Sequence, residues 1–401
     1  MLSLAIRTVR YQNNQAGDLA ILRTNPERRH ENAAPDPGEG ARNRTSTRHY
    51  HGLDLLRSVA LILGVIFHAA MPVLTPEYLG LGQQDVPAEI PAAPMLGIFM
   101  DWTHIWRMPA FFLLAGFFAQ MVLMRKGPMA FLADRTVRIF GVLVTFCILF
   151  AMLSGGSPFD LGHLWFLWFL SLMCLIATAA WYVPLQWMQA SASWLSASLP
   201  NLTLLIVPVV VASLIGREGT SAPVPATVFD TRLGPFMYFW VFFLIGQVLW
   251  LGRARIEDLA RLPVFGSLLI GSTCSFLVLG ALSPIAIAFH IAGSATTLML
   301  VFGLIGMTHA LLNRPNRLVR FAVSTAYPVY IFHVWPAIAL SIFMMSRGLG
   351  PTMTVVSSSI LTILICLGVY VVLVRHTPLD WLFSGYAKSW FKWPWRANGW
   401  S

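Results

Sequence analysis

The residues best suited to chemistry begin in one apolar segment, HGLDLLRSVALILGVIFHAA, at positions 51–70. Asp54 and Arg57 lie near its start, and His68 lies 11 residues after Arg57, well inside the apolar run. At about 100° and 1.5 Å per residue, a helix places Arg57 and His68 on one stripe, about 16 Å apart along its axis. Ionisable side chains in a membrane helix usually face a protein interior or a wet cavity. The imidazole could therefore be a general base at membrane depth, or the segment could hold a juxtamembrane anchor and one buried, hydrogen-bonded histidine.

A second polar group opens the segment DWTHIWRMPAFFLLAGFF. Asp101, His104 and Arg107 follow one another at intervals of three, so they line one side of the first two helical turns. We expect them beside the outer water interface, close to the depth of His68. They could hold a substrate, or they could form an interfacial salt bridge with a structural role only.

Two arginines mark the cytoplasmic edge of the next apolar segment, in DRTVRIF. Arg135 and Arg138 are three residues apart. Two guanidinium groups at this spacing can hold phosphates bidentately. They could equally be anchors that follow the positive-inside rule.

Further polar side chains occur in GHLWFLWFL and STAYPVYIFHVWP. His163 lies beside two tryptophans at the predicted outer interface, where aromatic belts are common. Tyr327, Tyr330 and His333 step by three and form another polar stripe. The sequence holds no P-loop, no dinucleotide-binding glycine pattern and no HExxH or GxSxG motif, and nothing in it predicts a metal site.

The composition indicates that membrane helices position these residues. Hydrophobic residues make up 57% of the 401 residues and charged residues only 11%, and the mean hydropathy is +0.68. Soluble domains carry about 25% charged residues, so a membrane protein is the class that fits. The net charge of +10 does not predict a nucleic-acid partner, because the basic residues form no face or stripe and lie between apolar segments.

Apolar segments of about 20 residues, the length that crosses a bilayer, occur ten times. Their approximate bounds are 53–73, 98–123, 136–154, 163–183, 199–216, 234–252, 264–283, 286–312, 322–345 and 354–374. If the N-terminus is cytoplasmic, 23 of the 27 Lys and Arg residues fall on the cytoplasmic side and three in outer loops. The sequence therefore predicts an all-α, polytopic membrane protein of about ten transmembrane helices with both termini in the cytoplasm.

Three regions are expected along the chain. Residues 1–48 are polar and rich in Arg, Asn, Pro and Gly, which predicts a disordered cytoplasmic arm, and they hold no apolar run of signal-peptide length. Residues 49–385 are expected to form the membrane domain, and residues 386–401 a short cytoplasmic tail.

The order of these motifs resembles the acyltransferase 3 family of membrane acyltransferases. The likeness consists of R-x10-H in the first span, RMPAFFLLAGFF in the second, R-x-x-R opening the third, HLWFL in the fourth and YPVYIFH in the ninth. It runs from about residue 50 to 385. The chain departs from the pattern at Ala115, before Gly116, where many members have Ser, so any contact made by that hydroxyl is absent here.

The resemblance implies ten membrane helices, an acyl-CoA donor on the cytoplasmic side and a sugar hydroxyl as acceptor on the far side. No cofactor would be tightly bound, because succinyl-CoA or acetyl-CoA would be a donor substrate. The acceptor would be a periplasmic or surface glycan, with an osmoregulated periplasmic glucan as the expected case. The protein would lie in the bilayer of a bacterial inner membrane and cross it many times.

The resemblance also assigns roles to residues. Arg57 and His68 correspond to the R-x10-H pair and are expected to be catalytic, and Arg135 and Arg138 correspond to the R-x-x-R pair that would bind acyl-CoA. We expect His68 to act as a general base toward the acceptor hydroxyl or as a transient acyl carrier. Arg107 is the expected cation for a succinyl carboxylate. The residues expected to hold the acceptor or the acyl group are Asp101, His104, Arg107, His163, Tyr330 and His333.

Two other classes of protein remain open. A secondary transporter would also bury His, Asp and Arg, but it should show internal repeats or paired broken helices, and neither is visible in the sequence. A flippase-like component of glycan export without acyl chemistry would keep the spans and tolerate the loss of His68.

Overall fold

The computed structural model describes residues 50–75, 93–183, 193–195, 197–230, 232–282, 285–312 and 317–384, together with residue 190. The predicted arm at 1–48 and the predicted tail at 386–401 lie outside these residues. Apart from Val183, the described residues belong to one compact unit.

Within the described ranges, every regular element is a helix, and nine helical segments are long and apolar enough to cross a membrane. They are His51–Leu74 (α3), Pro94–Lys126 (α4), Pro128–Ser154 (α5, η2 and α6), Gly162–Ala180 (η3 and α7), Leu199–Gly216 (α9 and α10), Leu233–Leu251 (α11), Leu262–Leu282 (α13), Ala286–Leu312 (α14) and Pro351–Val374 (α17 and η4). A tenth span results if α15 (Arg317–Phe332) and α16 (Val334–Ser346) count as one bent span. The prediction of an all-α polytopic membrane protein is confirmed.

The third span starts earlier than its hydropathy predicts. Its helix begins at Pro128, directly after Gly127, so residues that the sequence places in a cytoplasmic loop are helical. Gly127 has a φ of +80°, which glycine adopts without strain, and a proline suits the first position of a helix. A π-helical stretch, η2 (Thr136–Gly141), separates α5 (Pro128–Arg135) from α6 (Val142–Ser154) and carries Arg138.

The ninth predicted span, 322–345, is broken rather than straight. α15 ends at Phe332, α16 begins at Val334, and the two helices are bent by 70°. Pro336 explains the break, because it lacks the N–H that a continuous helix would bond to the Phe332 carbonyl, and its ring clashes with that carbonyl. His333 therefore lies at the break.

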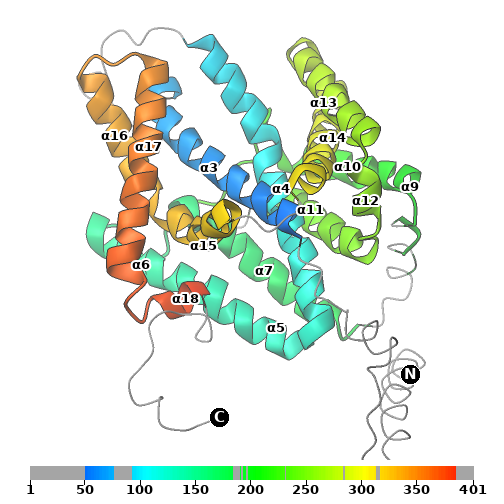
Figure 1. The fold of residues 1–401 in the computed structure, drawn as a ribbon, viewed down its shortest axis with the longest axis horizontal. Helices are drawn as coiled ribbons and strands as arrows, with labels where there is room; N and C mark the ends of the chain where they lie inside the picture. The colour runs from blue at the N-terminus through cyan, green and yellow to red at the C-terminus, as the bar shows by residue number, and fades with distance from the viewer. Residues whose placement is uncertain are drawn as a thin grey trace, which may run out of the picture. The chain divides into compact units, whose positions relative to one another are not determined.

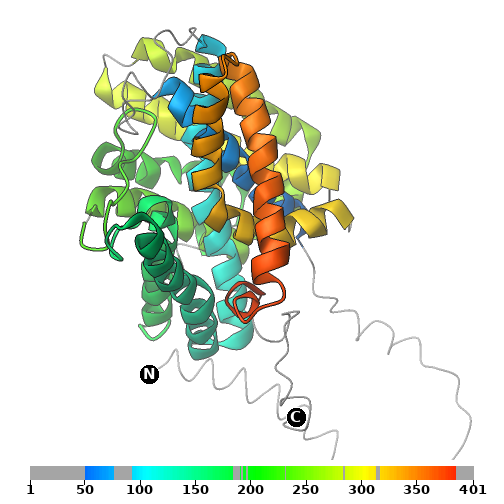
Figure 2. The ribbon, with the colours of Figure 1, turned by 90° about the vertical axis from the view of Figure 1, so that its left-hand side faces the viewer.

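α3 lies at the centre of the described helices. It contacts α4, α14, α15, α16 and α17. Figure 1 shows α3 in blue, with α16 and α17 on one side of it and α4 and α14 on the other. Figure 2, turned by 90°, shows α16 and α17 in orange and red lying side by side. A polar side chain on α3 can therefore meet residues from several spans.

α4 and α11 cross at two glycines. A Cβ added at Gly116 would overlap the Phe243 carbonyl, and a Cβ added at Gly246 would overlap the Leu113 carbonyl. Small residues allow this close approach of membrane helices. The crossing fixes α4, the helix that carries His104 and Arg107.

Gly116→Ala is therefore expected to lower the free energy of unfolding by about 1–3 kcal/mol, because the added methyl group must displace backbone. The measurement is the melting temperature of the purified protein in detergent. Gly266→Ala in α13 is the matched control, since no atom lies within 4 Å of an added Cβ there. Equal melting temperatures for the two variants would contradict the close crossing.

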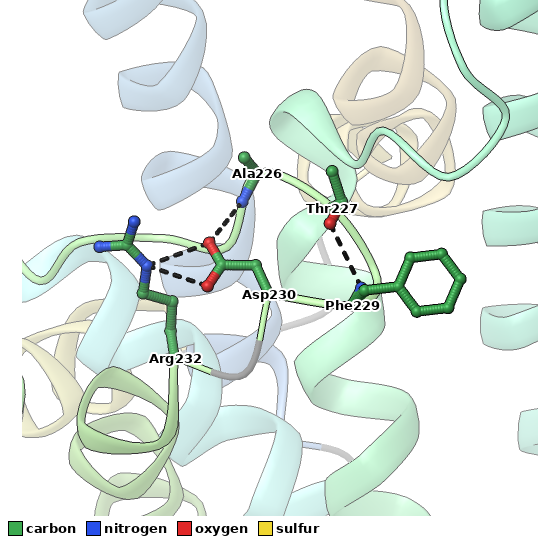
Figure 3. A network of polar contacts seen from close by, with 5 residues as sticks. All are labelled: Ala226, Thr227, Phe229, Asp230 and Arg232. Atoms are coloured by element: carbon green, nitrogen blue, oxygen red, sulfur yellow. Dashed lines mark hydrogen bonds and ion pairs between the residues drawn. The ribbon is translucent and has the colours of Figure 1, made fainter.

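Two loops on the predicted outer side are tied together. In the loop before α7 (Trp165–Ala180), the Leu161 N–H donates to the Ala226 carbonyl, which belongs to the loop after α10 (Ile206–Gly216), at 2.8 Å. In the second loop, the Asp230 carboxylate accepts from the Ala226 N–H at 3.2 Å and from Arg232 Nε at 3.0 Å (Figure 3). The second loop thus braces the start of the helix that carries His163.

Candidate active site

His68 on α3 faces His333 at the break between α15 and α16. Their ring centroids are 5.0 Å apart. His333 is buried, and its Nδ1 lies 2.8 Å from the Tyr330 carbonyl. Because a carbonyl only accepts, Nδ1 carries the hydrogen, and Nε2 of the neutral ring is an acceptor without a partner among the described residues. The His68 ring is partly exposed and also takes part in no described hydrogen bond. The break therefore places two imidazoles with available nitrogens next to each other.

His163, at the start of η3 (Gly162–Leu164), completes a row of three imidazoles. Its ring centroid lies 5.8 Å from that of His333, and its Nε2 donates to the Ile331 carbonyl at 3.0 Å. The Tyr330 hydroxyl donates to the His163 carbonyl at 2.8 Å, so it holds the backbone of one helix against another. We call His68, His163 and His333 the histidine cluster.

His104 and Arg107 on α4 reach this cluster through Phe67, the neighbour of His68. The His104 ring stacks on the Phe67 ring at a centroid distance of 4.9 Å, and the Arg107 guanidinium carbon lies 4.7 Å from the same centroid. Arg107 is buried, and its Nη1 donates to the Leu63 carbonyl at 3.2 Å. The structure thus places His104 and Arg107 of the second motif beside Phe67, the neighbour of His68 in the first motif.

Asp101 is more exposed than the other two residues of its motif. It is exposed, and its side chain lies against Thr220 in the loop after α10. Among the described residues, it forms no ion pair with Arg107 or His104. The salt bridge that would give this motif a purely structural role is therefore not formed in the described part of the chain.

Arg57, Arg135 and Arg138, which we call the arginine cluster, meet at the other end of α3. The charges of Arg135 and Arg138 act on Arg57. Arg57 lies 3.5 Å from Asp54, and the Asp134 carboxylate lies 3.8 Å from both other arginines. In the described ion pairs, three guanidinium groups thus share two carboxylates, which leaves an excess of positive charge suited to phosphate.

α15 links the two clusters. The Tyr327 hydroxyl donates to the Arg138 carbonyl at 2.6 Å, one helical turn before Tyr330 reaches His163. Arg138 Nη2 also donates to the Phe383 carbonyl of α18 (Asp380–Ser384) at 3.1 Å. The positions of the two clusters therefore depend on the same broken helix.

Sequence reasoning missed Arg217, which follows α10 directly and counted only as an outer-loop charge. It is buried, with 6% of its surface exposed, and its charge acts on His104. The only signal in the sequence is its place immediately after an apolar segment.

An all-α membrane domain that sets a histidine cluster and an arginine cluster along one central helix has the parts of an integral membrane enzyme for group transfer. The model of the acyltransferase 3 family, described as an acyltransferase domain, matches residues 50–371. The chain belongs to this family and is a membrane acyltransferase. No curated protein and no solved structure matches it.

Proposed function

We propose that this acyltransferase moves a succinyl or acetyl group from cytoplasmic acyl-CoA to a hydroxyl of a periplasmic or surface glycan, at the inner membrane of a bacterium. The observation that carries the proposal is that α3 bears Arg57 of the arginine cluster and, 11 residues further on, His68 of the histidine cluster. One helix thus links a phosphate-binding group on the predicted cytoplasmic side with a group able to take a proton nearer the outer side.

The arginine cluster is the proposed donor site. The phosphates of coenzyme A are strongly anionic, and guanidinium groups bind phosphate through charge-assisted, bidentate hydrogen bonds. With the phosphates at Arg57, Arg135 and Arg138, the pantetheine arm would extend along α3 and bring the thioester toward His68, about 16 Å away along the axis.

At the histidine cluster, His68 would take the proton of the acceptor hydroxyl. The hydroxyl oxygen attacks the thioester carbonyl, the ester C–O bond forms, the C–S bond breaks, and the coenzyme A thiolate leaves and takes up the proton. His333 is a positioning residue, because its unpartnered Nε2 can accept a hydrogen bond from His68 and so fix the His68 tautomer. In the alternative route, a His68 nitrogen first accepts the acyl group and then passes it to the hydroxyl.

The remaining predicted residues surround this reaction. Arg107, buried beside Phe67, would bind the carboxylate of a succinyl group. His104 would contact the glycan, and Asp101, which is exposed, would contact it nearer the outer water interface. His163 and Tyr330 would keep α7 and α15 in register around the cluster.

An osmoregulated periplasmic glucan is the acceptor we propose first. The blocks HIWRMPAFF, HLWFL and PLDWLFSG resemble glucans biosynthesis protein C, the succinyltransferase of these glucans. One observation favours a second candidate, a secondary transporter, because discontinuous helices often form transporter binding sites and α15 and α16 are such a helix.

Mass spectrometry of periplasmic glucans and surface polysaccharides tests the proposal in a deletion strain. Succinyl or acetyl esters should be lost in the deletion and return with the wild-type gene, and the mass shift and the modified glycan then identify acyl group and acceptor. Unchanged esters in every glycan pool would contradict the proposal. Glycan that accumulates in the cytoplasm, with its esters intact, would favour transport.

A further inference from the structure

We infer that Arg217 binds an anionic group of the substrate on the outer side, as a second cationic residue beside Arg107. This inference rests on the proposed function in one respect: it takes the anion to be a carboxylate of the transferred acyl group or an anionic group of the glycan.

Arg217 is buried and lacks a counter-ion within the described part of the chain. Its Nη2 donates to the Gly219 carbonyl at 3.1 Å, and the guanidinium lies beside the Tyr238 hydroxyl, but Nε and Nη1 are buried and form no hydrogen bond of standard geometry with a described residue. The described ion pairs do not include Arg217 either. A buried guanidinium that lacks a paired anion is costly, and a bound anion removes that cost.

Residues of two helices lie beside this guanidinium. Its central carbon lies 5.6 Å from the ring centroid of Tyr238, a buried residue of α11. On α14, a Cβ added at Gly293 would lie 3.0 Å from Nη1 of Arg217. A side chain at position 293 would therefore crowd Nη1, whereas glycine lets the guanidinium lie close against α14.

His104 connects Arg217 with the histidine cluster. Arg107 and Arg217 both lie within electrostatic range of His104, and His104 Nδ1, like Arg107 Nε, is buried without a partner among the described residues. Two buried cations near one imidazole repel each other unless an anion lies close to them. A carboxylate suits these donors, since it accepts two parallel N–H bonds from one guanidinium.

Arg232, at the other end of the same loop, forms the exposed ion pair that is expected of an arginine with a structural role only. Its side chain is 45% exposed and pairs with Asp230 at 3.0 Å (Figure 3). Both arginines have similar positions in the sequence, next to a predicted outer end of a span, but only Arg217 is buried and forms no ion pair with a residue that the structure describes. Arg232→Gln is therefore the matched control for Arg217→Gln.

The first experiment measures succinate binding to the full-length protein in nanodiscs by calorimetry. Arg217→Gln should weaken binding by about tenfold or more, whereas Arg232→Gln should not change it. Gly293→Ala keeps the charge but narrows the space at Nη1, so it should also weaken binding.

Arg217→Gln should melt no lower than wild type without succinate, because it removes an unpaired buried charge. Unchanged succinate affinity in Arg217→Gln and Gly293→Ala, or a lower melting temperature of Arg217→Gln with unchanged affinity, would overturn the inference.

Transfer assays with two donors identify the source of the anion. If it is the acyl carboxylate, Arg217→Gln should slow succinyl transfer by about tenfold or more and leave acetyl transfer unchanged. If it belongs to the glycan, both rates should fall by the same factor. A wild-type protein that transfers neither group but loses succinate binding through Arg217→Gln would refute the proposed function and keep the anion site. Normal transfer and binding in Arg217→Gln would refute the anion site alone.

Discussion

His68→Ala is expected to lower the rate of acyl transfer by about 100- to 10,000-fold, the range that a positioned general base contributes. The imidazole faces His333 at the break in α15 and α16, and no described hydrogen bond ties it to a structural role. The measurement is kcat in nanodiscs with purified glycan and acyl-CoA, together with the melting temperature of the variant.

The matched control is His376→Ala, which removes an exposed imidazole beyond η4 (Tyr370–Val374) and should leave kcat unchanged. An alanine variant of His68 with normal kcat would show that this histidine is structural. Acyl-CoA carrying a labelled acyl group separates the two routes when no acceptor is present. Label retained on His68 indicates an acyl carrier, and its absence at full activity indicates a general base.

The double variant Arg135→Gln and Arg138→Gln is expected to raise the KM for acyl-CoA by about 100-fold, with a smaller change in kcat. Each charge-assisted hydrogen bond to phosphate contributes about 1.5–3 kcal/mol, and 1.4 kcal/mol corresponds to a factor of ten. Initial rates at varied acyl-CoA concentration provide the measurement. Arg261→Gln is the control, because its 69% exposed side chain pairs with Asp258 away from the cluster.

Acyl-pantetheine, which lacks the nucleotide phosphates, distinguishes phosphate binding by the two arginines from a structural role. If the arginines bind phosphate, the double variant and the wild type should use acyl-pantetheine with the same kcat/KM. An equal loss with acyl-pantetheine and acyl-CoA would mean that the two arginines only anchor or support the helix. The structural alternative for the R-x-x-R pair would then be correct.

Hydropathy predicted the spans well because each one must satisfy the same requirement, about 20 apolar residues across the bilayer. It placed the start of the third span near residue 136, although the helix begins at Pro128, because a polar helical extension has no hydropathy signal. It predicted the ninth span at 322–345 without indicating the break in it. The signal for the break was Pro336, whose effect on the Phe332 carbonyl is local and can be read from the sequence.

The candidate site could be predicted only in part. Helical spacing predicted the stripe of Arg57 and His68, but it could not show that His333 would face His68, since that depends on the packing of α3 against α15 and α16. Spacing also grouped Asp101 with Arg107, but it could not show that Asp101 is exposed and Arg107 buried. Arg217 was missed because its burial depends on α11 and α14, which are distant in sequence. The roles of these residues, and the cytoplasmic arm and tail, stay predictions.

Cationic residues near both ends of α3 have an electrical consequence. Arg57 lies near the predicted cytoplasmic end of α3, and Arg107 contacts Leu63 and Phe67 nearer the outer end. A succinyl group that passes from one to the other carries its negative charge outward, in the direction that an inside-negative membrane potential favours. A full crossing is worth about 2.3 kcal/mol per 100 mV for each elementary charge. The membrane potential should therefore favour succinyl transfer. Acetyl transfer, which moves no charge, should not depend on the membrane potential.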